Sequence, residues 1–267
     1  MITHSPLEDV QSSIDARDLP IAKVGIRRVK WPLAWQAAHG VVHTVAEFEM
    51  AVHLPADQKG THMSRFIEAL NAMSAAGTVW NIHTAQTFVL DLSRRLEAQN
   101  AFFKARFDVF LPRKAPVTGT AALMDYPITL HGSAHNGVAS VDLEVQVPVM
   151  SLCPCSKKIS EYGAHNQRSH IHIRGTYTAT NLGVEDVVRW AEESASSALY
   201  PLLKRADEKY VTEYSYNNPK FVEDLVRDIA LAAQRDGRLS GVSIEAENFE
   251  SIHNHSAYAL IHVPQKP

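Results

Sequence analysis

The stretch Val141-Asp142-Leu143-Glu144-Val145-Gln146-Val147-Pro148-Val149 alternates apolar and other residues along its whole length. Successive side chains of a strand point to opposite faces of a sheet, so this pattern predicts a half-buried strand. Asn136-Gly137, just before it, is the strongest short-range hairpin signal. After Met150 comes Ser151-Leu152-Cys153-Pro154-Cys155. The stretch therefore predicts a sheet that ends at an unusual pair of cysteines.

Further strands and helices are predicted on both sides of this stretch. The strands are expected at about 21–35, 42–54, 103–111, 125–131, 169–178, 242–248 and 257–263. The helices are expected at 62–73 with Thr61 as N-cap, from Thr84 to 98, at 184–200, and from a start at Asn218-Pro219.

This order predicts the α+β class, with tandem ββααββ units, antiparallel sheets and helices on one face. We expect residues 1–18 to be a mobile tail, residues 19–115 to form the first unit and residues 116–267 to form the second. The second unit carries both cysteines.

Composition limits the kind of protein. The chain has 267 residues, 45% of them hydrophobic and 21% charged, which is typical of a soluble globular protein. Its formal net charge of −3 gives no indication of nucleic-acid binding. No apolar run approaches the roughly 20 residues that span a bilayer. Two cysteines cannot form a disulfide framework, so we expect a cytoplasmic protein. From the charge and the lack of a long apolar run, we expect neither a membrane nor a nucleic-acid partner.

Cys153, Cys155 and His165 form the most informative cluster. Thiolate and imidazole are preferred zinc ligands, and a catalytic zinc site uses three protein ligands with one open position. The third ligand would have to come from elsewhere in the chain. Buried structural cysteines and a redox pair are the alternatives, although the spacing is Cys-x-Cys rather than Cys-x-x-Cys. The spacing alone leaves metal chemistry and thiol chemistry open.

Other candidates for a site also have ordinary interpretations. His253 and His255 lie two residues apart near the last predicted strand, so they either share a pocket or are exposed edge residues. Asp207 and Glu208 lie in a mixed charge run that is typical of a solvated segment, and either carboxylate is a candidate third ligand. Glu223, off the apolar stripe of its helix, is either a partner of the helix dipole or a ligand-binding carboxylate.

Several long segments of the sequence resemble the type IB GTP cyclohydrolase I family. They are Ser151 to Ser169, Lys59 to Phe66, Leu203 to Val211, Asn218 to Asp224 and Glu250 to Tyr258. The resemblance implies a tunnelling fold and a homotetramer with active sites at subunit interfaces. It also implies conversion of GTP and water to 7,8-dihydroneopterin triphosphate and formate, the first step of tetrahydrofolate biosynthesis.

The resemblance also implies roles for individual residues. Cys153, His165 and Glu208 are the expected ligands of one divalent metal, with zinc or manganese as the first choices and iron(II) as another. Cys155 is expected to be a second essential thiol. Glu223 is expected to bind the guanine. His253 is expected to transfer protons, with His255 as the alternative.

The triphosphate of the substrate needs cations. The candidates are Lys157, Lys158, Arg168, Lys59 and Arg65. Two other functions remain open at this point. One is a different tunnelling-fold enzyme, such as a nitrile reductase that uses cysteine as nucleophile with NADPH. The other is a non-enzymatic protein that binds a purine or a metal.

Overall fold

The structure is a computed structural model that describes residues 9, 11, 13–179 and 181–263. Its strands are β1 (Ile21–Ala37), β2 (Gly40–Leu54), β3 (Val79–Trp80), β4 (Asn100–Lys114), β5 (Ala121–His135), β6 (Val138–Leu152), β7 (Asn166–Tyr177), β8 (Ser197–Ala198), β9 (Leu239–Asn248) and β10 (Ala257–His262). Its helices are α1 (Ser64–Ala75), α2 (Ile82–Arg95), α3 (Pro154–Ile159), α4 (Val184–Ser194), α5 (Arg205–Asn217) and α6 (Val222–Asp236).

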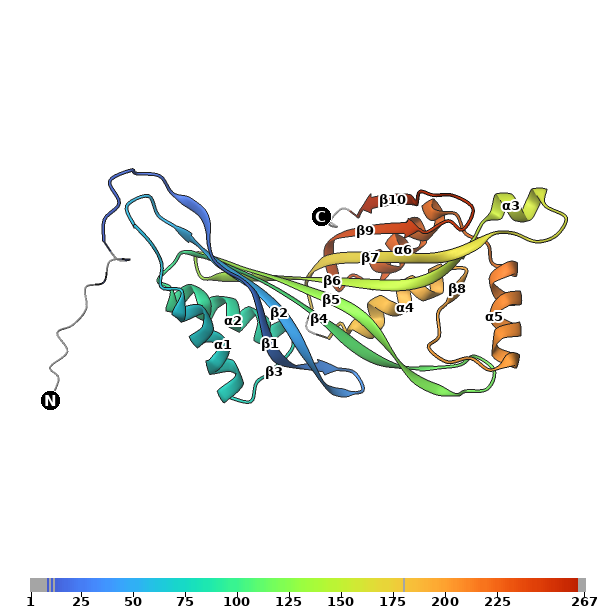
Figure 1. The fold of residues 1–267 in the computed structure, drawn as a ribbon, viewed down its shortest axis with the longest axis horizontal. Helices are drawn as coiled ribbons and strands as arrows, with labels where there is room; N and C mark the ends of the chain where they lie inside the picture. The colour runs from blue at the N-terminus through green and yellow to red at the C-terminus, as the bar shows by residue number, and fades with distance from the viewer. Residues whose placement is uncertain (1–8, 10, 12, 180, 264–267) are drawn as a thin grey trace. The chain divides into compact units, whose positions relative to one another are not determined.

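Within the described residues the strands form one sheet in the order β10-β9-β7-β6-β5-β4-β2-β1-β3, with β8 paired to β6. The pairs β6–β7, β7–β9 and β9–β10 are all antiparallel. Helix α6 packs against β9 and β10, and α4 packs against α6 and β8, so both cover the same side of the sheet (Figure 1). The predicted α+β class with antiparallel strands and one helical face is therefore confirmed.

The alternating stretch forms β6 as predicted. Val141, Leu143, Val145, Val147 and Val149 are all buried, because they point toward the helical side of the sheet. The residues between them are partly exposed on the other face. In the register of β6 with β7, Leu152 lies opposite Asn166, so these two strands end together.

The chain divides into two compact units. Unit 1 comprises Met1–Ala34, Val45–Ala105 and Leu130–Val141, and unit 2 comprises Trp35–Thr44, Arg106–Thr129 and Asp142–Pro267. The predicted division near residue 115 stays a prediction. Of the predicted tail, residues 1–8, 10 and 12 lie outside the described residues, whereas Ile14 forms a β-bridge with Gln58.

Unit 1 has an aromatic core. The ring of Phe88 on α2 lies 5.0 Å from that of Trp80, 5.4 Å from that of Phe103 and 6.1 Å from that of Phe48. Helices α1 and α2 pack against each other, and α1 buries Phe66 completely. Aromatic pairs at these spacings add to the stabilisation that burial of apolar surface supplies.

Unit 2 buries the apolar sides of α4 and α6. Helix α6 contacts β9 and β10, and α4 contacts α6 and β8. Val187 and Ala191 on α4 and Leu225 and Ile229 on α6 are fully buried. None of the helices in the described residues has the length and hydropathy needed to cross a membrane.

Two predicted N-caps are wrong. Met63, not Thr61, occupies the N-cap of α1, which begins at Ser64. Asn81 caps α2 by accepting a bond from the Thr84 amide at 2.9 Å, while the Thr84 hydroxyl accepts from the Asn81 amide at 2.7 Å. Thr84 is therefore the second member of a capping box and not its first.

The helical prediction over 184–200 is too long, because α4 ends at Ser194 and Ser197–Ala198 pair with β6 instead. The predicted start at Asn218-Pro219 is also wrong. Asn218 ends α5 and donates from Nδ2 to the Ala195 carbonyl at 2.9 Å, and Phe221 is the N-cap of α6. Helices α3 and α5 were not predicted, since neither carries a long apolar stripe.

Candidate active site

The ends of β6 and β7 bring Cys153 and His165 together. The Cys153 amide donates to the His165 carbonyl at 3.1 Å, which continues the β6–β7 ladder by one bond. Cys153 is the N-cap of α3, and its sulfur accepts a hydrogen bond from the Ser156 amide at 3.5 Å. The Ser156 hydroxyl accepts from the His165 amide at 3.1 Å. Strand register and one serine therefore hold the candidate thiol and imidazole in place.

Cys155 lies on α3 and is exposed, whereas Cys153 is partly buried, and neither forms a disulfide. His165 is partly buried, and its Nδ1 lies 3.0 Å from Oε1 of the buried Gln167. Its Nε2 has no partner in the described part of the chain.

The adjacent carboxylates Asp207 and Glu208 differ completely in environment. Asp207 is fully buried and accepts bonds from the amides of Val117 (2.9 Å), Thr118 (2.8 Å) and Lys204 (2.9 Å) and from the Thr118 hydroxyl (2.7 Å). Burial raises the pKa of Asp207, but these hydrogen bonds outweigh it and hold the pKa well below its usual range. Asp207 is thus a structural acceptor, and Glu208, exposed in the first turn of α5, is the carboxylate left open.

Lys157 connects α3 to α5. Its ammonium donates to the carbonyl of Tyr216 and lies 4.4 Å from the centre of the Tyr216 ring. Lys157, a predicted triphosphate cation, therefore already has partners within the chain, whereas Lys158 and Arg168 are exposed.

No group of three or more His, Cys, Asp or Glu side chains in the described residues is close enough to hold one ion. The structure brings two of the three expected ligands together and does not bring Glu208 to them.

The loop before α6 is fixed to the end of β6. The Lys220 amide donates to the Leu152 carbonyl at 3.1 Å, next to Cys153. Asp224 accepts from the Phe221 amide at 3.0 Å and so caps α6. Glu223 lies in the same first turn and is exposed, as predicted from its place off the apolar stripe.

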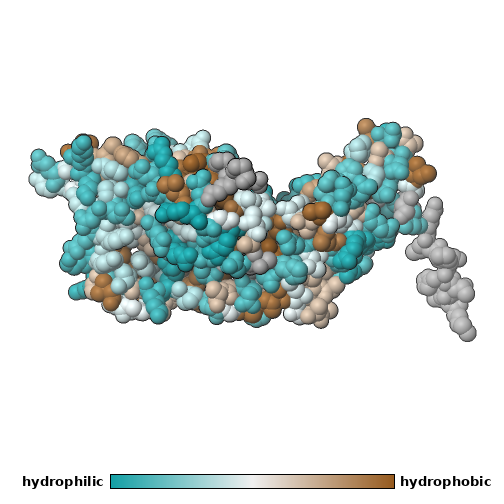
Figure 2. All heavy atoms as spheres, turned by 180° about the vertical axis from the view of Figure 1, so that it is seen from behind, coloured by the Kyte–Doolittle hydropathy of each residue, from teal (hydrophilic) through white to brown (hydrophobic). Residues whose placement is uncertain are grey.

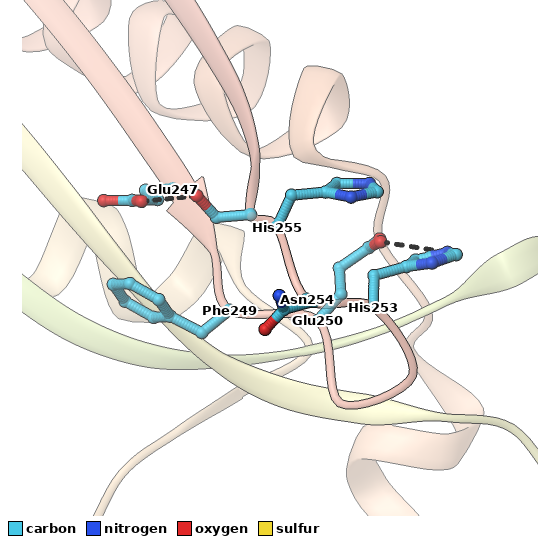
Figure 3. Close-up of a pocket in the computed structure, with 7 residues that line it drawn as sticks. Glu247, Phe249, Glu250, His253, Asn254 and His255 are labelled. Carbon is cyan, nitrogen blue, oxygen red and sulfur yellow. Dashed lines mark hydrogen bonds and ion pairs between the residues drawn. The ribbon is translucent and has the colours of Figure 1, made fainter.

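A pocket of about 330 Å³ lies in the loop between β9 and β10 (Figure 3). His253 and His255 lie in this loop rather than at the start of a strand, and their rings stack 4.9 Å apart at 15°. His253 Nε2 lies 3.6 Å from a carboxylate oxygen of Glu250. The Phe249 amide donates to the Arg168 carbonyl at 3.1 Å, which ties the loop to the start of β7.

Further polar contacts define the base of this pocket. The Ser256 hydroxyl donates to Glu247 Oε1 at 2.5 Å. His170 on β7 packs edge-on against Phe249 at 4.9 Å, and burial lowers the pKa of its imidazole, aided by the nearby His172. Glu250 and Gln167 were not singled out from the sequence. The signal for Glu250 was its spacing of three residues before His253, and Gln167 gave none.

Lys59 and Arg65 belong to unit 1, whereas the other candidate residues belong to unit 2. The Arg65 guanidinium donates to the Arg95 carbonyl at 2.9 Å and pairs with Glu97 at 3.0 Å. The Lys59 amide donates to the Ser13 carbonyl at 3.1 Å. The backbone amide of Lys59 and the side chain of Arg65 therefore already have partners within unit 1.

The surface beside the cysteines carries two exposed apolar side chains. Ile159 is 83% exposed and Tyr162 is 95% exposed, and both lie between Cys155 and His165 in the chain. On the face drawn in Figure 2, hydrophobic residues form small patches among hydrophilic ones.

Comparisons with known proteins agree on one family. Residues 7–259 match the family model described as type I GTP cyclohydrolase FolE2. The chain is 52% identical over 255 residues to GTP cyclohydrolase FolE2 of Ralstonia nicotianae, covering 96% of this chain and 94% of that protein. It is 51% identical over 256 residues to the protein of the same name from Burkholderia pseudomallei strain 1710b, covering 96% of this chain and 95% of that one.

Solved structures share the fold at low sequence identity. The uricase from Arthrobacter globiformis superposes with a TM-score of 0.51 at 8% identity, over 91% of this chain and 93% of that chain. The urate oxidase of Bacillus sp. TB-90 superposes with a TM-score of 0.50 at 8% identity, over 92% and 100%. These similarities confirm the predicted tunnelling fold.

Proposed function

Since this chain belongs to the type I GTP cyclohydrolase FolE2 family and is an enzyme of the GTP cyclohydrolase I type, we propose that it converts GTP at the junction of β6 and β7. The products are 7,8-dihydroneopterin triphosphate and formate. One observation carries this location: the Cys153–His165 backbone bond lies where the loops of Glu223 and His253 are also fixed, through Leu152 and Arg168.

We assign the metal to Cys153, His165 and Glu208. Sulfur, nitrogen and oxygen donors together suit zinc or manganese, and iron(II) is a further option. The free Nε2 of His165 and the exposed carboxylate of Glu208 fit this role, and Asp207 does not, because its oxygens are occupied. When bound, such an ion polarises the substrate and lowers the pKa of water.

The other residues of the site act on the purine. Glu223 accepts hydrogen bonds from the guanine N–H and exocyclic amine, which orients C8 for hydrolysis. Cys155 supplies the second thiol. His253 moves protons as the imidazole ring of guanine opens, and a carboxylate oxygen of Glu250 lies 3.6 Å from its Nε2. His255, stacked on His253, is the alternative proton carrier.

The triphosphate is assigned to the exposed cations first. Lys158 lies on α3, between Cys153 and His165, Arg168 lies near the start of β7, and both side chains are exposed. Lys157, Lys59 and Arg65 remain further candidates, although Lys157 and Arg65 would have to leave their present partners.

We assign the assembly to a homotetramer with active sites between subunits. Ile159 and Tyr162, which are exposed between Cys155 and His165 in the chain, would be available for such a contact. Two unpaired thiols in the site also fit a reducing cytoplasm.

Formate release from GTP, with detection of the fluorescent pterin after oxidation, tests the function. Protein supplied with Mn²⁺ or Zn²⁺ should give both products, and a chelator should abolish them. Glu208→Gln should lose metal and activity, whereas Glu213→Gln, a second exposed carboxylate of α5, should retain both. Absence of product with every metal would refute the function, and full activity of Glu208→Gln would refute the ligand assignment.

A further inference from the structure

We propose that Gln167 is a positioning residue that fixes His165 with its proton on Nδ1, through a buried chain of hydrogen bonds ending at Asn248. The use of the resulting Nε2 lone pair for a metal rests on the proposed function. The tautomer itself rests only on the hydrogen bonds within the chain.

The chain of bonds is continuous and buried. His165 Nδ1 lies 3.0 Å from Gln167 Oε1, and Gln167 Nε2 donates to Ser151 Oγ at 2.7 Å. Ser151 Oγ lies 2.8 Å from Ser169 Oγ, which donates to Asn248 Oδ1 at 2.7 Å. Ser151 and Ser169 are completely inaccessible, and Gln167 and Asn248 are 7% and 4% exposed. Four polar side chains thus hydrogen-bond one another in the interior.

The donors in this chain all point one way. A hydroxyl has one proton, so Ser169, which donates to Asn248, must accept from Ser151. Ser151 has then used its own proton and must accept from Gln167, which therefore turns its amide nitrogen toward Ser151. Its oxygen is left facing His165, and an oxygen can only accept. His165 must therefore carry a proton on Nδ1, and the lone pair of neutral His165 lies on Nε2.

This arrangement has a chemical consequence. Imidazoles that ligate metals commonly donate their other N–H to a fixed acceptor, which sets the tautomer and the ring orientation. Gln167 provides that acceptor from the buried side of β7. The chain also spans β6, β7 and β9, and Asn248 directly precedes the loop that carries His253. The same buried bonds therefore support both sides of the proposed site.

A purely structural role would predict the same burial and the same loss of stability on mutation. The tautomer of His165 separates the two interpretations, because core packing alone does not select between the two ring nitrogens. The test therefore measures which ring nitrogen of His165 carries the proton in metal-free protein.

The experiment uses the full chain labelled with ¹⁵N-histidine, at a pH where the imidazoles are neutral. The signal of His165 is assigned by its loss in His165→Gln. Wild type should show a protonated Nδ1 and an unprotonated Nε2. Gln167→Leu should give a mixture of tautomers, and Gln167→Glu, whose carboxylate still accepts from Nδ1, should restore the wild-type pattern.

A milder variant covers the case in which Gln167→Leu does not fold. Ser169→Ala removes one oxygen and frees the direction of the remaining bonds, so His165 should again populate both tautomers. Ser197→Ala is the matched control, since Ser197 is buried and its hydroxyl donates to the neighbouring Ala198 carbonyl, outside this chain of bonds. A protonated Nε2 in wild type, or an unchanged tautomer in Ser169→Ala, would overturn the proposal.

Zinc affinity separates this proposal from the proposed function. Gln167→Leu should weaken Zn²⁺ binding by about 10- to 100-fold, the usual effect of losing the partner of a ligating histidine. If the tautomer changes in Gln167→Leu while zinc affinity does not, the positioning role stands and His165 is not a ligand.

Discussion

Replacing Lys157 by Met should weaken metal binding more than GTP binding. Lys157 lies on α3, four residues after Cys153, and its ammonium contacts both the carbonyl and the ring of Tyr216. Tyr216 lies near the end of α5, the helix that carries Glu208. Lys157 therefore connects the helix of the thiols to the helix of the proposed carboxylate ligand.

The size of the effect follows from the two contacts. A hydrogen bond from a charged group contributes about 1.5–3 kcal/mol, and a cation–π contact at a partly exposed site about 0.5–1 kcal/mol. Ordering the long lysine side chain offsets up to about 2 kcal/mol of this sum. With the full offset, a net of up to about 2 kcal/mol remains, which corresponds to a metal affinity lower by up to about 30-fold, at 1.36 kcal/mol per factor of ten.

Competition with a chromogenic chelator measures Zn²⁺ affinity, and steady-state kinetics at saturating metal gives KM for GTP. Lys158→Met is the matched control, since Lys158 is the exposed neighbour on the same helix. We expect it to raise KM and leave metal affinity unchanged. The reasoning is refuted if Lys157→Met binds zinc like wild type and raises KM as much as Lys158→Met does, because Lys157 would then be a triphosphate cation.

Three further substitutions have definite expected outcomes. Asp207→Asn should lower the thermal midpoint at pH 7. Because the pKa of Asp207 is depressed by folding, its contribution is complete above the unfolded pKa of about 3.9 and is lost as the pH falls, so the difference from wild type should shrink at pH 3. A constant difference would contradict this. Glu223→Gln should lower kcat/KM for GTP by about 10- to 100-fold through loss of a charged hydrogen bond, and unchanged kinetics would exclude Glu223 from the guanine site. Gly25→Ala should destabilise the fold by about 1–3 kcal/mol in urea denaturation, since its Cβ would lie 1.9 Å from the Met50 carbonyl oxygen. A wild-type midpoint would show that β1 and β2 can separate locally.

The strands were predictable because alternation is a local property of the sequence. In β4 the predicted apolar positions from Phe103 to Leu111 are all buried, and in β6 those from Val141 to Val149 are as well. The end of α4 was not predictable in the same way. Residues after Ser194 continue a helical pattern of small apolar side chains, but β6 offers Ser197 and Ala198 backbone partners that a helix would have forgone.

The candidate site was predictable only where residues lie close in sequence. Cys153 and His165 meet because Cys153 follows β6, His165 precedes β7, and these two strands pair. Gln167, Ser151, Ser169 and Asn248 gave no such signal. Polar residues on the buried face of a strand interrupt the apolar pattern, and their mutual hydrogen bonds exist only in the folded sheet.

The choice between Asp207 and Glu208 shows why one further ligand could not be selected from sequence. The two side chains have the same chemistry, and successive residues of a helix point about 100° apart. Once Asp207 faces inward to accept bonds from Val117 and Thr118, Glu208 cannot share that environment and must face outward. The buried carboxylate fixes the start of α5, and so it fixes the direction of the exposed one. Loss of Asp207 should therefore misplace Glu208 as well as lower stability, whereas loss of Glu208 should leave α5 intact.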